Sequence, residues 1–329
     1  MPIKAKGLVN MKKILALIMA AAMGMSLASC GKDGYTVGIC QQMPHVALDS
    51  ATEGFQTALT EALGEENVTF LVQNAQGDST ACTTIVNDFV TKNVDLILGN
   101  ATNALQAAAN GTATIPVLGT SVTEYGTALG IEDFDGLVGT NVSGTSDLAP
   151  LDEQAAIITD IFPDTKTVGL LYCSAEPNSA YQVKVVKENL EAKGITCTEF
   201  PFADSNDITA VSKAAAAASD VIYIPTDNTA AACAEAINGA VLPTGTPIVG
   251  GDEGICSGCG IATLCIDYYD LGVTTGKMAA KILTGEADIA EMEIAYAENF
   301  EKVYNPTNCE ALKIDTAALE AAGYVAIEK

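Results

Sequence analysis

From residue 35 to residue 283, short runs of β-branched and other apolar residues alternate with longer Ala-rich stretches of helical periodicity. Residues 94–98 and 220–224 are apolar at nearly every position, which is typical of strands buried on both faces of a parallel sheet. Repeated alternation of strand and helix predicts an α/β fold whose parallel strands are joined by helical crossovers. The pattern therefore predicts doubly wound parallel sheets.

The pattern divides into two series of similar length, separated near residues 141–146. The first series predicts strands at 35–41, 67–73, 95–99, 115–120 and 137–142, and helices at 48–63, 78–92 and 102–110. The second predicts strands at 167–173, 195–201, 220–225, 247–250 and 261–266, and helices at 150–162, 178–193, 207–217, 228–239 and 268–284. Two series indicate two lobes. Beyond residue 288 the pattern is irregular, with strand-like residues 293–296 and 302–304 and a helix near 316–322.

The first 29 residues have the pattern of a bacterial lipoprotein signal. Two lysines precede an apolar stretch, residues 14–27, that is too short to span a bilayer as a stable helix. Ala28 and Ser29 are small and are followed by Cys30, the expected lipid acceptor. We expect residues 1–29 to be removed and Cys30 to anchor the protein outside the cytoplasmic membrane. The alternative is an ordinary signal peptide followed by a chance cysteine.

The charge of the chain excludes several kinds of partner. It carries 41 acidic residues against 16 lysines, for a net charge of −25. Nucleic acid and anionic membrane surfaces are therefore not expected partners. There is no arginine, so an anionic ligand must be held by backbone N–H groups, hydroxyls, amides or lysine. His45 is the sole histidine, which removes most histidine-based zinc sites.

The usual signatures of enzymes are not present. Residues 272–277 resemble a phosphate-binding loop but are one residue short and fall within a helical pattern. Neither a dinucleotide fingerprint nor a Gly-x-Ser-x-Gly nucleophile motif occurs. Cys256 and Cys259 are expected in a Gly-rich loop, where they could form a reversible disulfide or remain a pair of thiols, whereas a metal site would need two further ligands. We therefore expect no metal, no cofactor and no enzymatic activity, with a thiol oxidoreductase as a weaker alternative.

Polar side chains gather where the predicted strands end. In open α/β sheets, ligands bind at the carboxyl ends of strands. Ser, Thr, Asn and Asp also cap helices there, so one such loop alone means little. Eight loops of this kind predict a binding cleft between the lobes. They lie at residues 41–45, 74–78, 99–103, 119–123, 146–147, 176–179, 225–228 and 250–253.

Several of these segments, in this order, resemble the ABC-transporter substrate-binding protein family whose characterised members bind aromatic amino acids. The matching segments are residues 41–49, 54–55, 74–78, 146–150, 178–179, 225–228, 250–252 and 267–269. The resemblance implies the type I periplasmic-binding-protein fold, with two lobes and three crossovers between them. We then expect residues 30–143 and 268–297 to form lobe one, and residues 144–267 and 298–329 to form lobe two.

The resemblance also implies a ligand site, carried over by position. In lobe one it comprises Gln41, His45, Asn74, Thr102, Ser121 and Thr123. In lobe two it comprises Asn178, Asp227 and Asp252. Cys256 and Cys259 match no feature of the family.

The expected function is that of a lipid-anchored, monomeric receptor that closes on an amino acid and delivers it to an ABC permease in the membrane. Hydroxyls of lobe one and a helix N-terminus would hold the ligand carboxylate. Asp227 and Asp252 would hold the ammonium group. The alternatives are a sensory module, or a nucleoside or sugar receptor, of the same fold.

Overall fold

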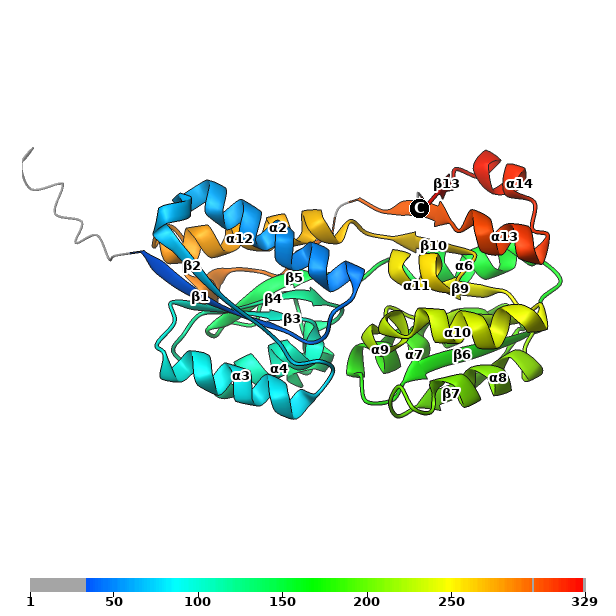
Figure 1. The fold of residues 1–329 in the computed structure, drawn as a ribbon, viewed down its shortest axis with the longest axis horizontal. Helices are drawn as coiled ribbons and strands as arrows, with labels where there is room; N and C mark the ends of the chain where they lie inside the picture. Colours follow the sequence, from blue (N-terminus) through cyan, green and yellow to red (C-terminus); the bar gives the residue numbers. More distant parts are fainter. Residues whose placement is uncertain (1–33, 298, 328–329) are drawn as a thin grey trace, which may run out of the picture.

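The computed structural model describes residues 34–297 and 299–327 as two α/β lobes that lie side by side (Figure 1). The expected signal segment, residues 1–29, and Cys30 lie outside the described residues. Within the described part of the chain, no helix is long and apolar enough to cross a membrane.

The first lobe is built on a six-stranded sheet of order β11-β5-β4-β3-β1-β2, in which every paired strand is parallel. Its strands are β1 (Tyr35–Gln41), β2 (Val68–Asn74), β3 (Leu96–Asn100), β4 (Val117–Val122), β5 (Val142–Ser146) and β11 (Ala295–Tyr296). Helices α2 (Val46–Leu63) and α12 (Tyr268–Leu283) cover one face, and α3 (Ser79–Thr91), α4 (Thr102–Gly111) and α5 (Tyr125–Leu129) cover the other. Both faces of the sheet are therefore buried, as the continuous apolar strands predicted.

Helices α2 and α12 are more than 200 residues apart in the sequence and pack closely against each other. Two buried glycines make this approach possible. A Cβ atom on Gly54 would lie 2.1 Å from the carbonyl oxygen of Tyr269, and one on Gly272 would lie 2.1 Å from that of Ala51. Backbone meets backbone at these points, which leaves no room for a side chain.

The second lobe has a seven-stranded sheet of order β13-β12-β10-β9-β8-β6-β7. Its strands are β6 (Thr167–Cys173), β7 (Thr196–Phe202), β8 (Val221–Ile224), β9 (Ile248–Gly250), β10 (Ala262–Cys265), β12 (Glu301–Tyr304) and β13 (Val325–Ala326). The β10–β12 pair is antiparallel and the remaining pairs are parallel.

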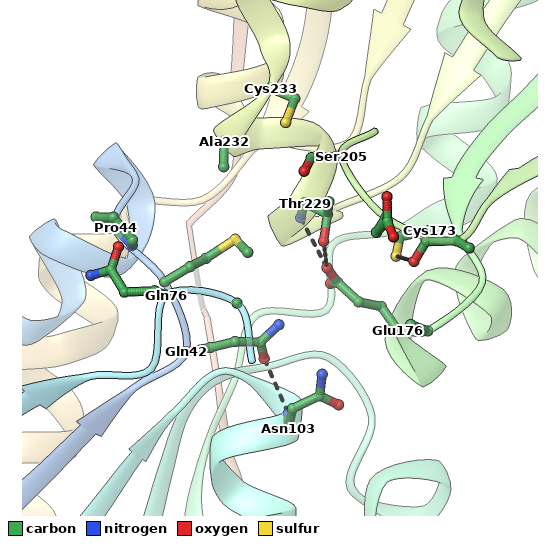
Figure 2. Close-up of a pocket in the computed structure, with 15 residues that line it drawn as sticks. Gln42, Pro44, Gln76, Asn103, Cys173, Glu176, Ser205, Thr229, Ala232 and Cys233 are labelled. Atoms are coloured by element: carbon green, nitrogen blue, oxygen red, sulfur yellow. Dashed lines mark hydrogen bonds between the residues drawn. The ribbon is translucent and has the colours of Figure 1, made fainter. Parts of the chain in front are cut away.

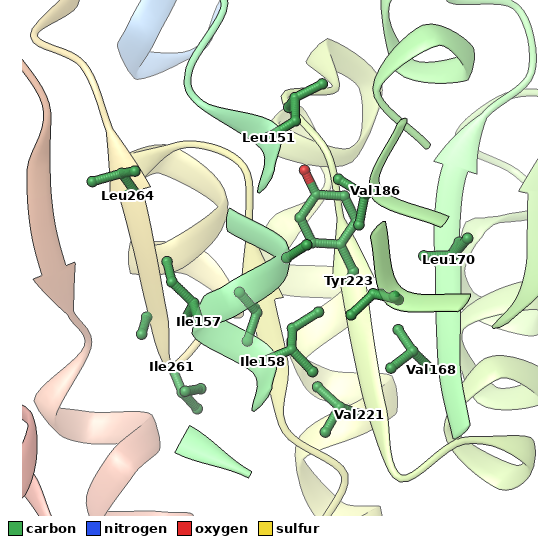
Figure 3. Close-up of a cluster of buried hydrophobic side chains, with 14 of the residues drawn as sticks. Leu151, Ile157, Ile158, Val168, Leu170, Val186, Val221, Tyr223, Ile261 and Leu264 are labelled. Atoms are coloured by element: carbon green, nitrogen blue, oxygen red, sulfur yellow. The ribbon is translucent and has the colours of Figure 1, made fainter. Parts of the chain in front are cut away.

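Apolar side chains fill both faces of the second sheet. Helices α6 (Leu151–Ile161) and α7 (Pro177–Ala192) bury residues such as Ile158 and Val186 against Val168 and Tyr223 (Figure 3). On the opposite face pack α8 (Ile208–Ala218), α10 (Ala234–Val241) and the short helices α9 (Asn228–Ala232) and α11 (Glu253–Gly258). Helices α13 (Pro306–Leu312) and α14 (Thr316–Ala321) follow β12, and the 3-10 helices are η1 (Glu65–Asn67), η2 (Leu242–Thr244) and η3 (Ile289–Glu291).

The chain passes between the lobes three times: between β5 and α6, between β10 and α12, and between β11 and β12. This confirms the predicted fold of two doubly wound lobes with three crossovers. The first segment of lobe one is expected to end at residue 143. Strand β5 pairs with β4 as far as Ser146, so the first sheet extends three residues beyond that boundary.

Three local predictions were wrong. Residues 137–141 are not a strand, because Gly139 has a left-handed φ of 72°; the strand begins at Val142, and Leu137 makes only an isolated bridge. The predicted helix 228–239 is broken at Cys233 into α9 and α10. Cys256 lies in helix α11 and Cys259 directly follows it, rather than both lying in a loop.

Candidate ligand-binding cleft

A cavity of about 400 Å³ lies between the lobes, where strands β1, β6 and β7 end (Figure 2). This volume suits a small molecule. Lobe one contributes Gln42 and Asn103, and the Gln42 side-chain oxygen accepts a hydrogen bond from the Asn103 backbone N–H at 3.2 Å. Lobe two contributes Glu176 and Thr229. The structure thus brings strand ends of both lobes to one cleft.

His45 bridges the lobes. Its Nε2 lies 3.1 Å from Oδ1 of Asn228. The Asn228 amide nitrogen donates to Glu176 at 2.7 Å, so its oxygen faces the histidine and Nε2 carries the proton. Burial lowers the pKa of His45, which favours this neutral form. His45 therefore donates a hydrogen bond to the opposite lobe when the lobes are together.

Glu176 is a central residue that the sequence analysis did not select. It is buried, and its two oxygens accept from the Asn228 backbone N–H (3.0 Å) and side chain, and from the Thr229 N–H (2.9 Å) and hydroxyl (2.7 Å). The sequence shows only an acid before Pro177, which suggests a cap for α7. The carboxylate instead holds the first residues of α9, 52 residues further along the chain.

Three of the predicted hydroxyl residues, Thr102, Ser121 and Thr123, are buried at the carboxyl ends of β3 and β4. Helix α4 follows Ala101, which has a φ of 83° and offers no side-chain cap, and the side chain of Gln42 accepts one of its first N–H groups. Ser121 also has a positive φ, 55°, and its buried hydroxyl has no hydrogen-bond partner in the described part of the chain. Backbone strain of this kind is often found at functional sites. The start of α4 thus reaches the cavity through Asn103, and the Ser121 hydroxyl is without a partner among the described residues.

Gln41 and Asn74 are occupied within lobe one. Gln41 donates to Asp49 at 2.6 Å and accepts from the Thr52 hydroxyl at 2.7 Å. The Asn74 side-chain oxygen accepts from the Gln76 backbone N–H at 2.9 Å. These bonds fix the loops after β1 and β2.

The predicted lobe-two residues are all buried, but they differ in their partners. Both oxygens of Asp227 accept backbone hydrogen bonds, from Ala230 at 2.8 Å and Cys173 at 2.6 Å. Burial, followed by the charge of Glu176, raises the pKa of Asp227. Asp252 caps α11 through the Ile255 N–H at 2.8 Å, and burial raises its pKa to about 7. Asn178 donates to the Thr226 carbonyl at 3.0 Å, while its own side-chain oxygen has no partner among the described residues.

Cys256 and Cys259 are buried and unpaired. Burial raises the pKa of both thiols, which disfavours the thiolate that redox chemistry needs. Across residues 34–297 and 299–327, no group of three or more His, Cys, Asp or Glu side chains could hold a metal ion.

Comparison with known proteins places this geometry in a family. Residues 36–321 match the family described as ABC transporter substrate binding protein, a family of solute-binding proteins rather than enzymes. The chain is 28% identical to a tyrosine-binding protein of Clostridioides difficile (strain R20291), over 97% of each chain.

Solved structures of substrate-binding proteins are also similar to this chain. One, described as an ABC domain in complex with L-Trp from Streptococcus pneumonia, is 30% identical, with a TM-score of 0.84 over 89% of this chain and 100% of that one. Another, the ligand-free, open structure of a substrate-binding protein with adhesive properties from Clostridium difficile, is 32% identical, with a TM-score of 0.67 over 89% and 100%. The family match and these likenesses extend over nearly all of the described residues. The chain therefore belongs to the ABC transporter substrate-binding protein family.

Proposed function

We propose that the protein is the extracytoplasmic receptor of an ABC importer, and that it binds an amino acid, preferably an aromatic one, between its lobes. An aromatic amino acid is supported as the ligand by the similarity, over almost the whole chain, to a relative named for tyrosine binding and to a structure containing L-Trp. In this role the protein hands its ligand to the membrane permease of the importer.

The arrangement of the lobes supports binding by closure. The structure is more similar to the L-Trp complex than to the ligand-free, open relative, although the two are almost equally identical in sequence. The His45–Asn228 contact joins the lobes on one side, and α5 of lobe one packs on α7 of lobe two. A ligand that contacts both lobes only in this closed state shifts the equilibrium towards it.

The residues suggest which end of the amino acid each lobe receives. The carboxylate would lie at the N-terminus of α4 with the hydroxyls of Thr102, Ser121 and Thr123, because helix N-termini bind anions without arginine. Asn178 and Asp252 would form the lobe-two side of the region that receives the ammonium group. The loops that position these groups would be held by Gln41, Asn74 and Asp227. His45 would stabilise the closed state through its hydrogen bond to Asn228.

A ligand screen tests the proposal. Purified protein is heated with each of the twenty amino acids and, as representatives of other ligand classes, with adenosine, glucose and myo-inositol. A true ligand at a hundred times its dissociation constant should add about 2.7 kcal/mol of stability. We expect the largest shifts with L-tyrosine or L-tryptophan. A shift with a sugar or nucleoside, and with no amino acid, would refute the proposed ligand class.

Lipid anchoring is tested separately, by replacing the expected lipid acceptor. We expect Cys30→Ala to move the protein from the membrane fraction to the soluble fraction of cells, because two acyl chains supply the anchor. Cys197→Ala, which leaves the signal segment intact, should stay in the membrane fraction. If Cys30→Ala also stays there, the lipoprotein interpretation is wrong.

A further inference from the structure

Asp147 is a buried acid at the first passage between the lobes. It follows β5, and its side-chain oxygen Oδ2 accepts a hydrogen bond from the hydroxyl of Tyr268 at 3.0 Å. Tyr268 begins α12, at the second passage between the lobes. Asp147 is only 4% exposed, yet its other oxygen, Oδ1, accepts no hydrogen bond within the described part of the chain.

The other buried acids of the cleft are satisfied differently. Glu176, Asp227 and Asp252 each accept backbone N–H groups at the start of a helix. Asp147 caps no helix of the described chain. Among the described residues, the ion pairs are Lys92–Asp88 and Lys187–Glu199, both at the surface, so no lysine there compensates Asp147. A buried carboxylate without a cation is costly, and burial accordingly raises the pKa of Asp147. A positive charge placed beside its free oxygen would offset that cost.

Asp147 lies at the carboxyl end of β4, the edge of the first sheet at which ligands of open α/β sheets bind. Its backbone N–H donates to the carbonyl of Val122 at 3.3 Å, which brings it beside Ser121 and Thr123. The Thr123 hydroxyl lowers the pKa of Asp147 in part, against the larger rise that burial causes. The pKa of Asp252 of lobe two is raised by burial and, to a smaller extent, by the charge of Asp147, so the two acids lie near each other. Ser121 Oγ and Asn178 Oδ1 are two further buried polar atoms without a partner among the described residues. These three unpartnered atoms thus come from lobe one, from lobe two and from the segment that joins the lobes.

We propose that Asp147 is the residue that receives the α-ammonium group of the bound amino acid, and that Tyr268 is a positioning residue that orients its carboxylate. This inference rests on the proposed function. An ammonium group has three donors and no acceptor, so it complements the free oxygens of Asp147 and Asn178. Asp147 then selects zwitterions, and compounds that lack the amino group leave its charge buried and unpaired.

The test compares ligands that differ only in the amino group. L-Tyrosine is paired with 3-(4-hydroxyphenyl)propionate and L-tryptophan with indole-3-propionate, and affinities are measured by calorimetry. We expect wild type to bind each amino acid at least 100-fold more tightly than its deaminated partner. Asp147→Asn should lose at least 100-fold affinity for the amino acids and stay within threefold of wild type for the deaminated acids. Glu188→Gln, which alters an exposed acid of α7 that does not line the cavity, should behave as wild type.

The possible outcomes are distinct. If wild type binds no amino acid, the proposed function fails, and this inference fails with it. If wild type binds amino acids but Asp147→Asn binds them equally well, or loses both members of each pair alike, only this inference is overturned.

A second variant covers the case in which Asp147→Asn does not fold. Tyr268→Phe keeps the carboxylate and removes the group that orients it. It should reduce the preference for the amino acid over its deaminated partner by at least fivefold. An unchanged preference would contradict the positioning role.

Discussion

Gly272→Ala is expected to destabilise the protein by about 3 kcal/mol or more, although alanine normally favours a helix over glycine by about 1 kcal/mol. The new methyl group would lie 2.1 Å from the carbonyl oxygen of Ala51 and 2.9 Å from the backbone nitrogen of Phe55. Backbone atoms of a packed helix cannot move aside as a flexible side chain does. Overpacking usually costs about 1–3 kcal/mol, and this contact belongs at the upper end or beyond.

The measurement is urea unfolding followed by circular dichroism, with Gly239→Ala as the matched control. Gly239 is also a helical glycine, in α10, but a Cβ atom there meets nothing within 4 Å. The control should gain about 0.5–1 kcal/mol from helix propensity. Equal effects at the two positions would mean that α2 and α12 do not pack as closely as described.

Glu176→Ala is expected to lose at least about 3 kcal/mol of stability and most of the ligand affinity. Its carboxylate accepts four hydrogen bonds from Asn228 and Thr229, and hydrogen bonds to a charged group contribute about 1.5–3 kcal/mol each without adding fully. Its loss also frees the Asn228 side chain, which then no longer presents its oxygen to His45 across the cleft.

Unfolding in urea and binding of L-tyrosine are both measured for this variant. Glu188→Ala is the control, because Glu188 is an exposed acid of α7 that does not line the cavity, and its stability should stay within about 0.5 kcal/mol of wild type. Glu176→Gln should fall between wild type and Glu176→Ala, because one acceptor oxygen remains. A wild-type stability for Glu176→Ala would show that the network does not hold the start of α9.

The fold was largely readable from the sequence, because burial on both faces of a parallel sheet leaves continuous apolar runs and covering helices leave a helical period. Strands β1, β6 and β7 begin and end within one residue of the prediction. The errors arose where a single residue or a very short element departs from the periodic pattern of apolar residues. Gly139 interrupts an apolar run, and α11 is too short to show a helical period.

The candidate site was readable only as a set of loops. The sequence determined that polar residues follow the strands, that no arginine is available to hold an anion, and that His45 stands alone among them. It could not rank the acids of these loops, because an acid between a strand and a helix is compatible with a local cap in every case.

Tertiary structure alone decided the role of each acid. Asp227 and Asp252 cap helices nearby in the chain, whereas Glu176 caps one that starts 52 residues away. Asp147 meets Tyr268 across 121 residues and keeps one oxygen without a partner among the described residues. A cap on the next helix depends on a few neighbouring residues, so it can be recognised in the sequence. A contact between residues far apart in the chain depends on how the elements pack, and the sequence does not show it. The sequence therefore determined the fold and predicted the sheet edge at which we propose that the ligand binds. Packing determined which carboxylate keeps an oxygen without a partner among the described residues.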